Sequence, residues 1–154
     1  RPGRRGGSVH AVGAQRRCAP SGFAGELGRQ RQRQLLIAPA PAVAAEDYFV
    51  APEKLLEGNP KQTAWVEYQD ASGHFCTGLW ASEVGAWRIR YTEEEYCRIL
   101  EGRSVITDEA GHAVSVGPGD EFTIPAGFVG TWRVLEPTRK RFVIFEQAPG
   151  DGAG

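Results

Sequence analysis

The sequence predicts an all-β fold, either a sandwich or a barrel. Apolar and polar residues alternate with a period of two from about residue 63 to residue 146, as in strands that bury one face. Eight or nine such segments follow one another at intervals of roughly ten residues, with turn residues between them. No helical periodicity lies between the segments, so a parallel sheet with crossover helices is excluded.

Each expected element has its own boundary signals. Pro52 and Gly58 bracket residues 51–58 and predict one short helical turn. The expected strands then follow in chain order at residues 63–68, 74–80, 86–91, 96–100, 103–107, 112–116, 121–124, 130–135 and 140–146. The turns between them are indicated by Gly, Pro, Asp and Ser, at residues 70–73, 101–102, 108–111, 117–120 and 137–138.

The first 34 residues differ in composition from the rest of the chain. They hold eight arginines and one acidic residue, Glu26, so their net charge is +7; the net charge of −1 overall leaves −8 on residues 35–154. With almost no periodic apolar residues they cannot form a core, and we expect them to be disordered. Weak nucleic-acid binding, a signal peptide ending near residues 42–44 and an organelle transit peptide are alternative interpretations.

We interpret this basic segment as upstream sequence that does not belong to the working protein. The chain contains no Met and begins at Arg1, which agrees with this interpretation. We therefore predict a disordered or non-native extension over residues 1–44 and one domain over residues 45–154. With the signal and transit peptides set aside, we expect a cytoplasmic protein.

Composition excludes several classes of partner and site. The net charge of −1 gives no case for a nucleic-acid partner, and no apolar stretch approaches the roughly 18 to 20 residues of a membrane span. His10, His74 and His112 share no metal-ligand spacing. The three cysteines are far apart and form no Cys-x-x-Cys pair, so the sequence contains no motif typical of a zinc site.

Two stretches of the chain have motif-like patterns of glycine, proline and acidic residues. Residues 85–102 end in Leu-Glu-Gly, and residues 119–130 contain Gly-Asp followed by Pro125 and Gly127. These stretches resemble the first and the second sequence motif of the cupin family. Over residues 58–146 the chain resembles the small single-domain cupins grouped with ureidoglycine aminohydrolase and an ethanolamine-utilisation cupin. This resemblance implies a double-stranded β-helix, a jelly-roll barrel whose interior is lined by side chains.

The residues at the expected metal-ligand positions depart from that family. Metal-binding cupins use two His and a Glu of the first motif and a His of the second; here the His positions fall on Ile89 and Tyr91, or on Tyr91 and Glu93, and then on Gly130. Only Glu95 matches. Because transition metals prefer imidazole, we predict no metal and no other cofactor in the barrel. The reaction of ureidoglycine aminohydrolase, which binds manganese, is not expected here.

A different set of side chains is expected inside the barrel. Strand alternation sends Trp87 inward together with Tyr91, and Gly130 is expected to leave room beside Trp132. Lys140 matches a Lys of the family pattern, and an inward Lys needs a carboxylate such as Glu95 or Glu93. We predict catalytic roles for Tyr91, Glu95 and Lys140, and ligand-binding roles for Trp87, Glu93, Gly130 and Trp132.

Two classes of function agree with these residues. In the first, the protein binds and converts a small polar metabolite without a His-bound metal, using a Lys–Glu–Tyr set for proton transfer. In the second, it is a non-catalytic cupin that binds or senses a small ligand. A plain structural core with an exposed Lys140 is the alternative to both. We expect a homodimer, because small cupins commonly pair through strands and open sheet edges need cover.

Overall fold

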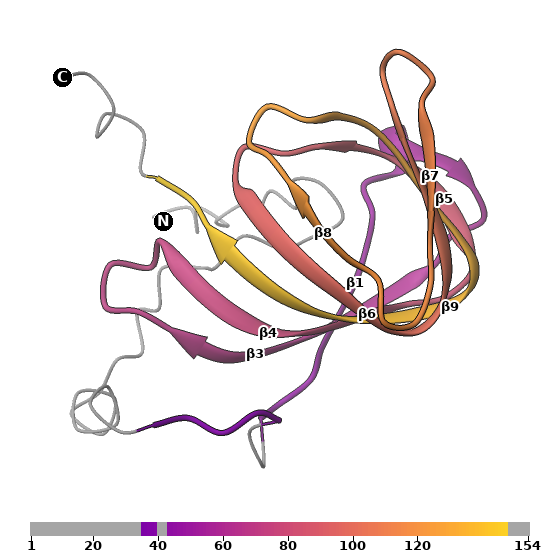
Figure 1. Cartoon of the computed structure of the whole chain (residues 1–154). Coiled ribbons are helices and arrows are strands. Elements are labelled where there is room, and N and C mark those ends of the chain that lie inside the picture. The colour runs from indigo at the N-terminus through magenta and orange to yellow at the C-terminus, as the bar shows by residue number, and fades with distance from the viewer. Residues whose placement is uncertain (1–34, 40–42, 148–154) are drawn as a thin grey trace, which may run out of the picture.

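The computed structural model describes residues 35–39 and 43–147, whose strands form one curled nine-stranded sheet (Figure 1). This confirms the all-β prediction. The described strands run from residue 46 to residue 145, inside the predicted domain of residues 45–154, whose limits stay a prediction. Residues 1–34, 40–42 and 148–154 lie outside the described residues, and so does most of the segment for which we predicted a disordered extension.

The structure contains nine strands and one short 3-10 turn in its described part. The turn, η1, spans Pro52–Lys54. The strands are β1 (Glu46–Phe49), β2 (Leu55–Glu57), β3 (Lys61–Gln69), β4 (Phe75–Ser82), β5 (Gly85–Arg90), β6 (Glu94–Asp108), β7 (Ala113–Val116), β8 (Glu121–Ile124) and β9 (Val129–Phe145).

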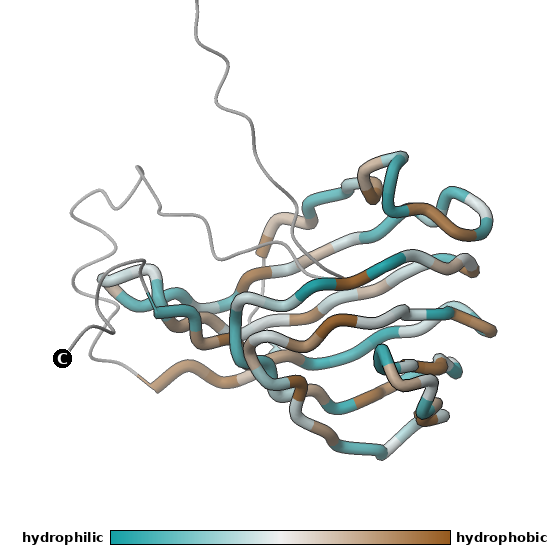
Figure 2. Tube along the Cα trace, turned by 90° about the horizontal axis from the view of Figure 1, so that it is seen from above, coloured by the Kyte–Doolittle hydropathy of each residue, from teal (hydrophilic) through white to brown (hydrophobic). Residues whose placement is uncertain are grey.

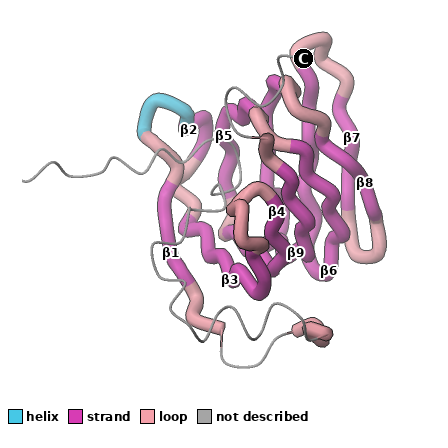
Figure 3. Tube along the Cα trace, turned by 90° about the vertical axis from the view of Figure 1, so that its left-hand side faces the viewer, coloured by secondary structure: helices cyan, strands magenta, loops and turns pink. Residues whose placement is uncertain are grey.

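The two longest strands, β6 and β9, pair along most of their length and connect the two halves of the barrel. The first half of β9 lies between β5 and β6, and the second half lies between β4 and β6. β3 and β1 extend the sheet beyond β4, while β7 and β8 pair with β6 (Figure 3). One continuous strand therefore carries side chains into both halves of the interior.

Two of the expected turns are bends inside continuous strands. We expected chain reversals at residues 101–102 and 137–138, but β6 and β9 pass through them. The pairing register shifts between Ile99 and Ser104, and Gly102 has a φ of +83°. A Cβ on Gly102 would lie 2.0 Å from the carbonyl oxygen of Pro137. Glycine and proline thus mark a bulge at which the paired strands curl together.

The N-terminal part of the described chain also differs from expectation. The helical turn predicted for residues 51–58 is limited to η1, because Leu55 pairs with Trp87 of β5 and continues as a strand. β1 was not predicted; it pairs antiparallel with β3, Glu46 opposite Ala64. In both places pairing with a distant strand outweighs the local signal. Among the described residues, no helix is long and apolar enough to cross a membrane.

The core lies inside the curled sheet. Apolar and polar residues alternate along the strands (Figure 2), and the inward positions of β4, β5, β6 and β9 are almost completely buried. Three indole rings, those of Trp80, Trp87 and Trp132, form its largest apolar part. Charged side chains are buried among them, which is unusual for a core and defines the candidate site.

Candidate functional site

The inward face of β6 and the residue just before this strand carry two buried carboxyl groups and a thiol. Glu93, Glu95 and Cys97 are each at most 1% exposed, whereas Glu94 and Tyr96 between them are exposed. This is the alternation of a strand, which sends every second side chain to the same side. Glu93 and Glu95, for which we predicted site roles, therefore both lie in the interior.

Lys140 projects from the second half of β9 into the same interior. Its side chain is fully buried, and Nζ lies 2.5 Å from Oε1 of Glu95, whose side chain is also fully buried. The structure thus confirms that Lys140 points inward and pairs with a carboxylate. This pairing satisfies the rule that a buried charge needs a counter-charge. The catalytic roles assigned to the two residues stay predictions.

The ammonium group of Lys140 lies between two indole rings. Nζ is 4.4 Å from the ring centroid of Trp132 and 4.7 Å from that of Trp80, within the range of cation–π attraction. Trp80 is held in place because its Nε1 donates hydrogen bonds to the hydroxyl of Tyr48 and to Oε1 of Gln62. Sequence reasoning missed Trp80 as a partner of Lys140, since only the register of β4 against β9 places the two residues opposite each other.

The route by which Lys140 reaches Trp132 differs from the prediction. We expected a turn at residues 137–138 and an antiparallel return, but both residues lie on the single strand β9. They occupy the same face of β9, and the bend between them brings Nζ to the Trp132 ring.

Cys97 is a member of the site that the sequence analysis did not identify. Its Sγ lies 2.7 Å from Oε1 of Glu95 and 3.5 Å from Nζ of Lys140. Burial, followed by the negative charge of Glu95, raises the pKa of the Cys97 thiol well above its ordinary value. The thiol therefore keeps its proton and donates a hydrogen bond to Oε1 of Glu95. Its position two residues after Glu95 on one strand face was the available signal.

The buried surroundings shift the pKa values of three groups. Burial first, and then the charge of Glu95, raise the pKa of Glu93 to about 7. Burial and Glu95 also raise the pKa of Tyr91 well above its ordinary value. Burial alone would lower the pKa of Lys140, but the Cys97 sulfur and the Glu95 carboxylate raise it above its ordinary value.

These shifts indicate the protonation states of the site at neutral pH. The raised pKa of Lys140 keeps its ammonium group protonated, and its catalytic role stays a prediction. Tyr91 stays a neutral phenol. Glu93, for which we predicted ligand binding, is the carboxyl group poised to exchange a proton near pH 7.

Several buried polar atoms around the ion pair have no hydrogen-bond partner in the described part of the chain. They are Oη of Tyr91, Oε1 of Glu93, Oε2 of Glu95, Nε1 of Trp87, Nε1 of Trp132 and Nε2 of Gln62. Leaving a buried donor or acceptor unpaired costs about 1–3 kcal/mol, so native proteins contain few of them. Both donors and acceptors are present in this set.

Of the four predicted ligand-binding residues, Gly130 takes no part in the interior. We expected its missing side chain to open space beside Trp132, and this is wrong. A Cβ at Gly130 would lie 2.0 Å from the carbonyl oxygen of Thr107, because the backbone of β6 occupies that position. Trp87 is fully buried and packs against Trp80 at a centroid distance of 6.3 Å.

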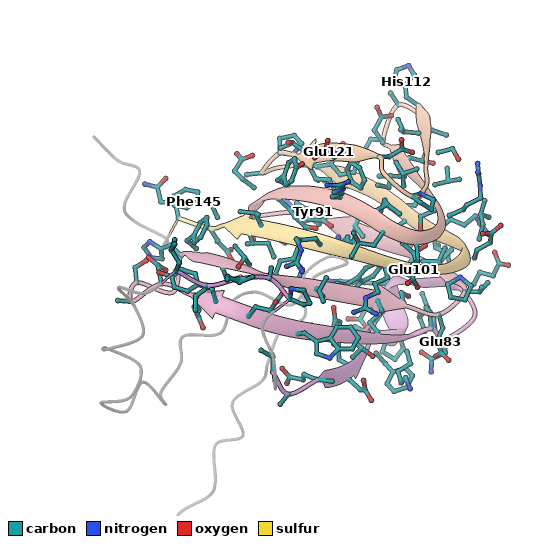
Figure 4. All side chains as sticks on the ribbon, turned by 60° about the horizontal axis from the view of Figure 1, so that its bottom comes forward. Glu83, Tyr91, Glu101, His112, Glu121 and Phe145 are labelled. Atoms are coloured by element: carbon teal, nitrogen blue, oxygen red, sulfur yellow. The ribbon has the colours of Figure 1, made fainter. Side chains whose placement is uncertain are left out.

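Tyr91 lies where the two motifs meet. Its backbone N–H donates to the carbonyl oxygen of Phe128, and its own carbonyl accepts from the N–H of Gly127. The two rings of Tyr91 and Phe128 meet edge to face at 6.4 Å. Figure 4 places Tyr91 among the strands. The second motif therefore closes over the end of the barrel at which Tyr91 and Glu93 are buried.

The donor set does not fit the metal that the resemblance implies. Ile89 and Tyr91 stand at the His positions of the first motif, and the ammonium of Lys140 already occupies Oε1 of Glu95. His112 lies on the exposed hairpin between β6 and β7, where it contacts Asp108. Residues 35–39 and 43–147 bring together no group of three or more His, Cys, Asp or Glu side chains suited to a metal.

Comparison with known proteins agrees with this geometry at the level of the fold. Residues 69–142 match the family model of the EutQ-like cupin domain. A protein of unknown function of the DUF861 family from Pseudomonas syringae pv. tomato is similar in structure, with a TM-score of 0.61 and 19% identity over 67% of this chain. The similarity covers 45% of the Pseudomonas chain, so the present chain spans less than half of that protein.

A EutQ protein and a putative ethanolamine utilization protein Q are also similar in structure. The EutQ protein of Clostridium difficile has a TM-score of 0.51 and 16% identity over 63% of this chain and 79% of its own. A putative ethanolamine utilization protein Q from Salmonella typhimurium has a TM-score of 0.51 and 14% identity over 69% of this chain and 98% of its own. Identities this low show the fold alone. No curated protein matches the sequence.

Proposed function

We propose, from the premise that this chain is a small cupin resembling the EutQ group, that it binds a small polar metabolite inside its barrel. One observation carries the proposal. The buried Lys140–Glu95 pair is surrounded by buried polar atoms that lack partners among the described residues. A ligand that supplies those hydrogen bonds removes a cost that the protein otherwise bears in its core.

The unpaired atoms define the chemistry of the ligand. The indole N–H groups of Trp87 and Trp132 require an acceptor, whereas the free carboxyl oxygens of Glu93 and Glu95 require a donor. Glu95 balances the charge of Lys140, so Glu93 is the additional acidic group. A small metabolite that carries both a nitrogen with N–H groups and an oxygen acceptor satisfies this set.

Conversion of the ligand is the further part of the proposal. Glu93 is the proton-transfer group, because its pKa of about 7 lets it accept or release a proton at neutral pH. Lys140 acts as a fixed positive charge, which stabilises negative charge that develops nearby in a reaction. The neutral hydroxyl of Tyr91 donates a hydrogen bond that orients the ligand. Lys140 supplies the positive charge that a metal ion supplies in metal-binding cupins.

A non-catalytic binding or sensing cupin is the second candidate. The closure of the site favours it, since Tyr91, Glu93 and Glu95 are at most 1% exposed. A ligand reaches them only when the barrel opens, and the segment of residues 125–128 over Tyr91 is the part that we expect to move. Such an opening coupled to binding suits a sensor. Turnover of a bound ligand, with a rate that depends on a group of pKa near 7, distinguishes the enzyme.

A thermal-shift screen of the full chain tests ligand binding. Small amines, amino alcohols and amides are compared with matched compounds that lack the nitrogen. We expect a nitrogen-bearing compound to raise the melting temperature of the wild type, and the rise to be lost in Glu93→Gln and Tyr91→Phe. Tyr96→Phe is the control, because Tyr96 points outward from β6. Equal shifts in Tyr91→Phe and Tyr96→Phe, or no shift with any compound, contradict the proposal.

A cytoplasmic homodimer without nucleic-acid or membrane partners completes the proposal. The edge strands β1 and β2 support the dimer, because each exposes a large apolar side chain: Phe49 is 54% exposed and Leu56 is 44% exposed. Light scattering measures the mass of the full chain directly. A monomer mass at micromolar and higher concentrations contradicts the dimer.

A further inference from the structure

A cleft of about 270 Å³ lies on the outer face of β3, β4 and β9, outside the barrel. It exists because Ala81 has a small side chain and stands between two larger neighbours in one cross-strand row, Thr63 on β3 and Arg139 on β9. Trp65 and Pro137 also line the cleft. The floor and part of the wall are therefore apolar.

Arg139 is held in a defined position at this cleft. Its guanidinium lies over the ring of Trp65, with Cζ 5.4 Å from the ring centroid. Stacking on an indole reduces the freedom of a long side chain and leaves its terminal Nη groups to bind other partners, whereas Nε of Arg139 is buried. Arg139 makes no ion pair within the described part of the chain.

The three hydroxyl groups of the cleft are already engaged. The hydroxyl of Thr63 donates to Asp47, that of Ser82 donates to the carbonyl of Glu83, and that of Thr138 pairs with Ser104. Recognition of a ligand therefore falls to the charged groups that line the cleft.

Those charged groups are balanced in sign. Lys61 and Arg139 are positive, and Glu83 and Glu101 are negative. Glu101 and Arg139 are direct neighbours across β6 and β9, yet no ion pair joins them. Glu83 uses one oxygen to accept the backbone N–H of Lys61 at 2.7 Å. A wall of zero net charge favours neither a simple anion nor a simple cation.

We propose that this cleft binds a small zwitterion, an α-amino acid with an apolar side chain. Its carboxylate pairs with the stacked guanidinium of Arg139, a geometry suited to two parallel N–H···O bonds. Its ammonium group pairs with Glu101, the opposite charge next to Arg139. Its apolar side chain lies against Trp65 and Pro137. This site is separate from the barrel, and it stands or falls independently of the function proposed above.

Calorimetric titration of the full chain with three related compounds tests the class of ligand. L-leucine carries both charges, N-acetyl-L-leucine lacks the ammonium group and L-leucinamide lacks the carboxylate. We expect L-leucine to bind, and each of the other two to bind at least about tenfold more weakly, the effect of one lost charge-assisted bond. The proposal is overturned if L-leucine does not bind, or if N-acetyl-L-leucine or L-leucinamide binds as tightly as L-leucine.

Variants of the protein locate the site. Arg139→Gln and Glu101→Gln should each weaken L-leucine binding by about tenfold, whereas Arg98→Gln, an exposed arginine outside the cleft, should leave it unchanged. Tyr91→Phe should also have no effect; a loss there would place the ligand in the barrel and overturn the proposal. Light scattering gives the mass of the protein in solution. A lower mass for Arg139→Gln than for the wild type would show that a second copy of the chain covers this face, and this result also overturns the proposal.

Discussion

The described part of the chain contains two sites at which a cation lies over an indole ring, and their surroundings differ. Inside the barrel, Lys140 lies between Trp80 and Trp132 and is closed off from water. On the outer face, Arg139 lies over Trp65 beside an open cleft. Nζ of Lys140 lies 2.5 Å from Oε1 of Glu95, whereas Arg139 forms no ion pair with any carboxylate among the described residues.

This difference shows how burial decides what a charge can do. In the interior a lone charge is so costly that Lys140 and Glu95 must neutralise each other. On the outer face Glu101 is exposed to water and Arg139 is only half-buried, so the two remain unpaired although they are neighbours. The inner pair is thus part of the fold as well as of the candidate site, and the outer charges are available to a ligand.

The largest expected effect is the loss of the inner cation. Lys140→Met should lower the free energy of unfolding by about 3–5 kcal/mol, because it leaves the carboxylate of Glu95 buried without a counter-charge. Arg133→Met is the matched change at the exposed pair with Glu57 and should cost less than about 1 kcal/mol. Urea denaturation measures both values.

The same experiment has an internal check. Adding Glu95→Gln to Lys140→Met removes the unpaired charge, so the double variant should be more stable than Lys140→Met alone. Two results would contradict the difference between the buried and the exposed ion pair. One is an equal loss of unfolding free energy in Lys140→Met and Arg133→Met, and the other is a further loss in the double variant.

The second effect concerns pH. Burial raises the pKa of Glu93 from 4.5 to about 7, so between these values the folded protein holds a proton that the unfolded chain has released. Stability therefore falls as pH rises through this window, by up to about 3 kcal/mol. Glu93→Gln should remove this decrease, and Glu94→Gln, at the exposed neighbour, should retain it. Denaturation curves between pH 4.5 and 8 measure it; parallel profiles for wild type and Glu93→Gln would disprove the assignment.

The third prediction compares the space for added side-chain atoms at Gly130, on β9, and at Ala81, in the outer cleft. Gly130→Ala should destabilise the protein by about 1–3 kcal/mol, because its Cβ would collide with the backbone at Thr107. Ala81→Val, which projects into the outer cleft, should change stability by less than about 1 kcal/mol and still block L-leucine. Thermal unfolding and calorimetry measure these effects. A stable Gly130→Ala would show that the barrel has the room we had expected.

The smallest expected effect is at the outer cation. Arg139→Gln should lower the free energy of unfolding by no more than about 1 kcal/mol, the range of an exposed cation–π contact. Denaturation alongside Lys140→Met gives the comparison directly. A loss as large as that of Lys140→Met would mean that Arg139 has a structural role, and that the cleft is not simply an open surface.

Part of the candidate site was predictable from local sequence. Alternation along one strand indicates that Glu93 and Glu95 share a face, and a Lys in a buried strand requires a carboxylate. The contacts with Trp80 and Cys97 were not foreseen. Trp80 lies far from Lys140 in sequence and meets it only through the register of β4 against β9. Cys97 was available on the same face of β6, but its role depends on the position of Lys140.

The sequence by itself determined the all-β fold and the inward or outward direction of most side chains, because strand periodicity is a local property. Only the tertiary structure decided that residues 101–102 and 137–138 are bends, that a neighbouring backbone fills the space at Gly130, and that Glu93 has the raised pKa. Each of these depends on which atoms surround a residue once distant strands have paired. Burial and register therefore distinguish a buried ion pair from an open cleft on the same strand, with Arg139 and Lys140 adjacent in sequence and opposite in direction.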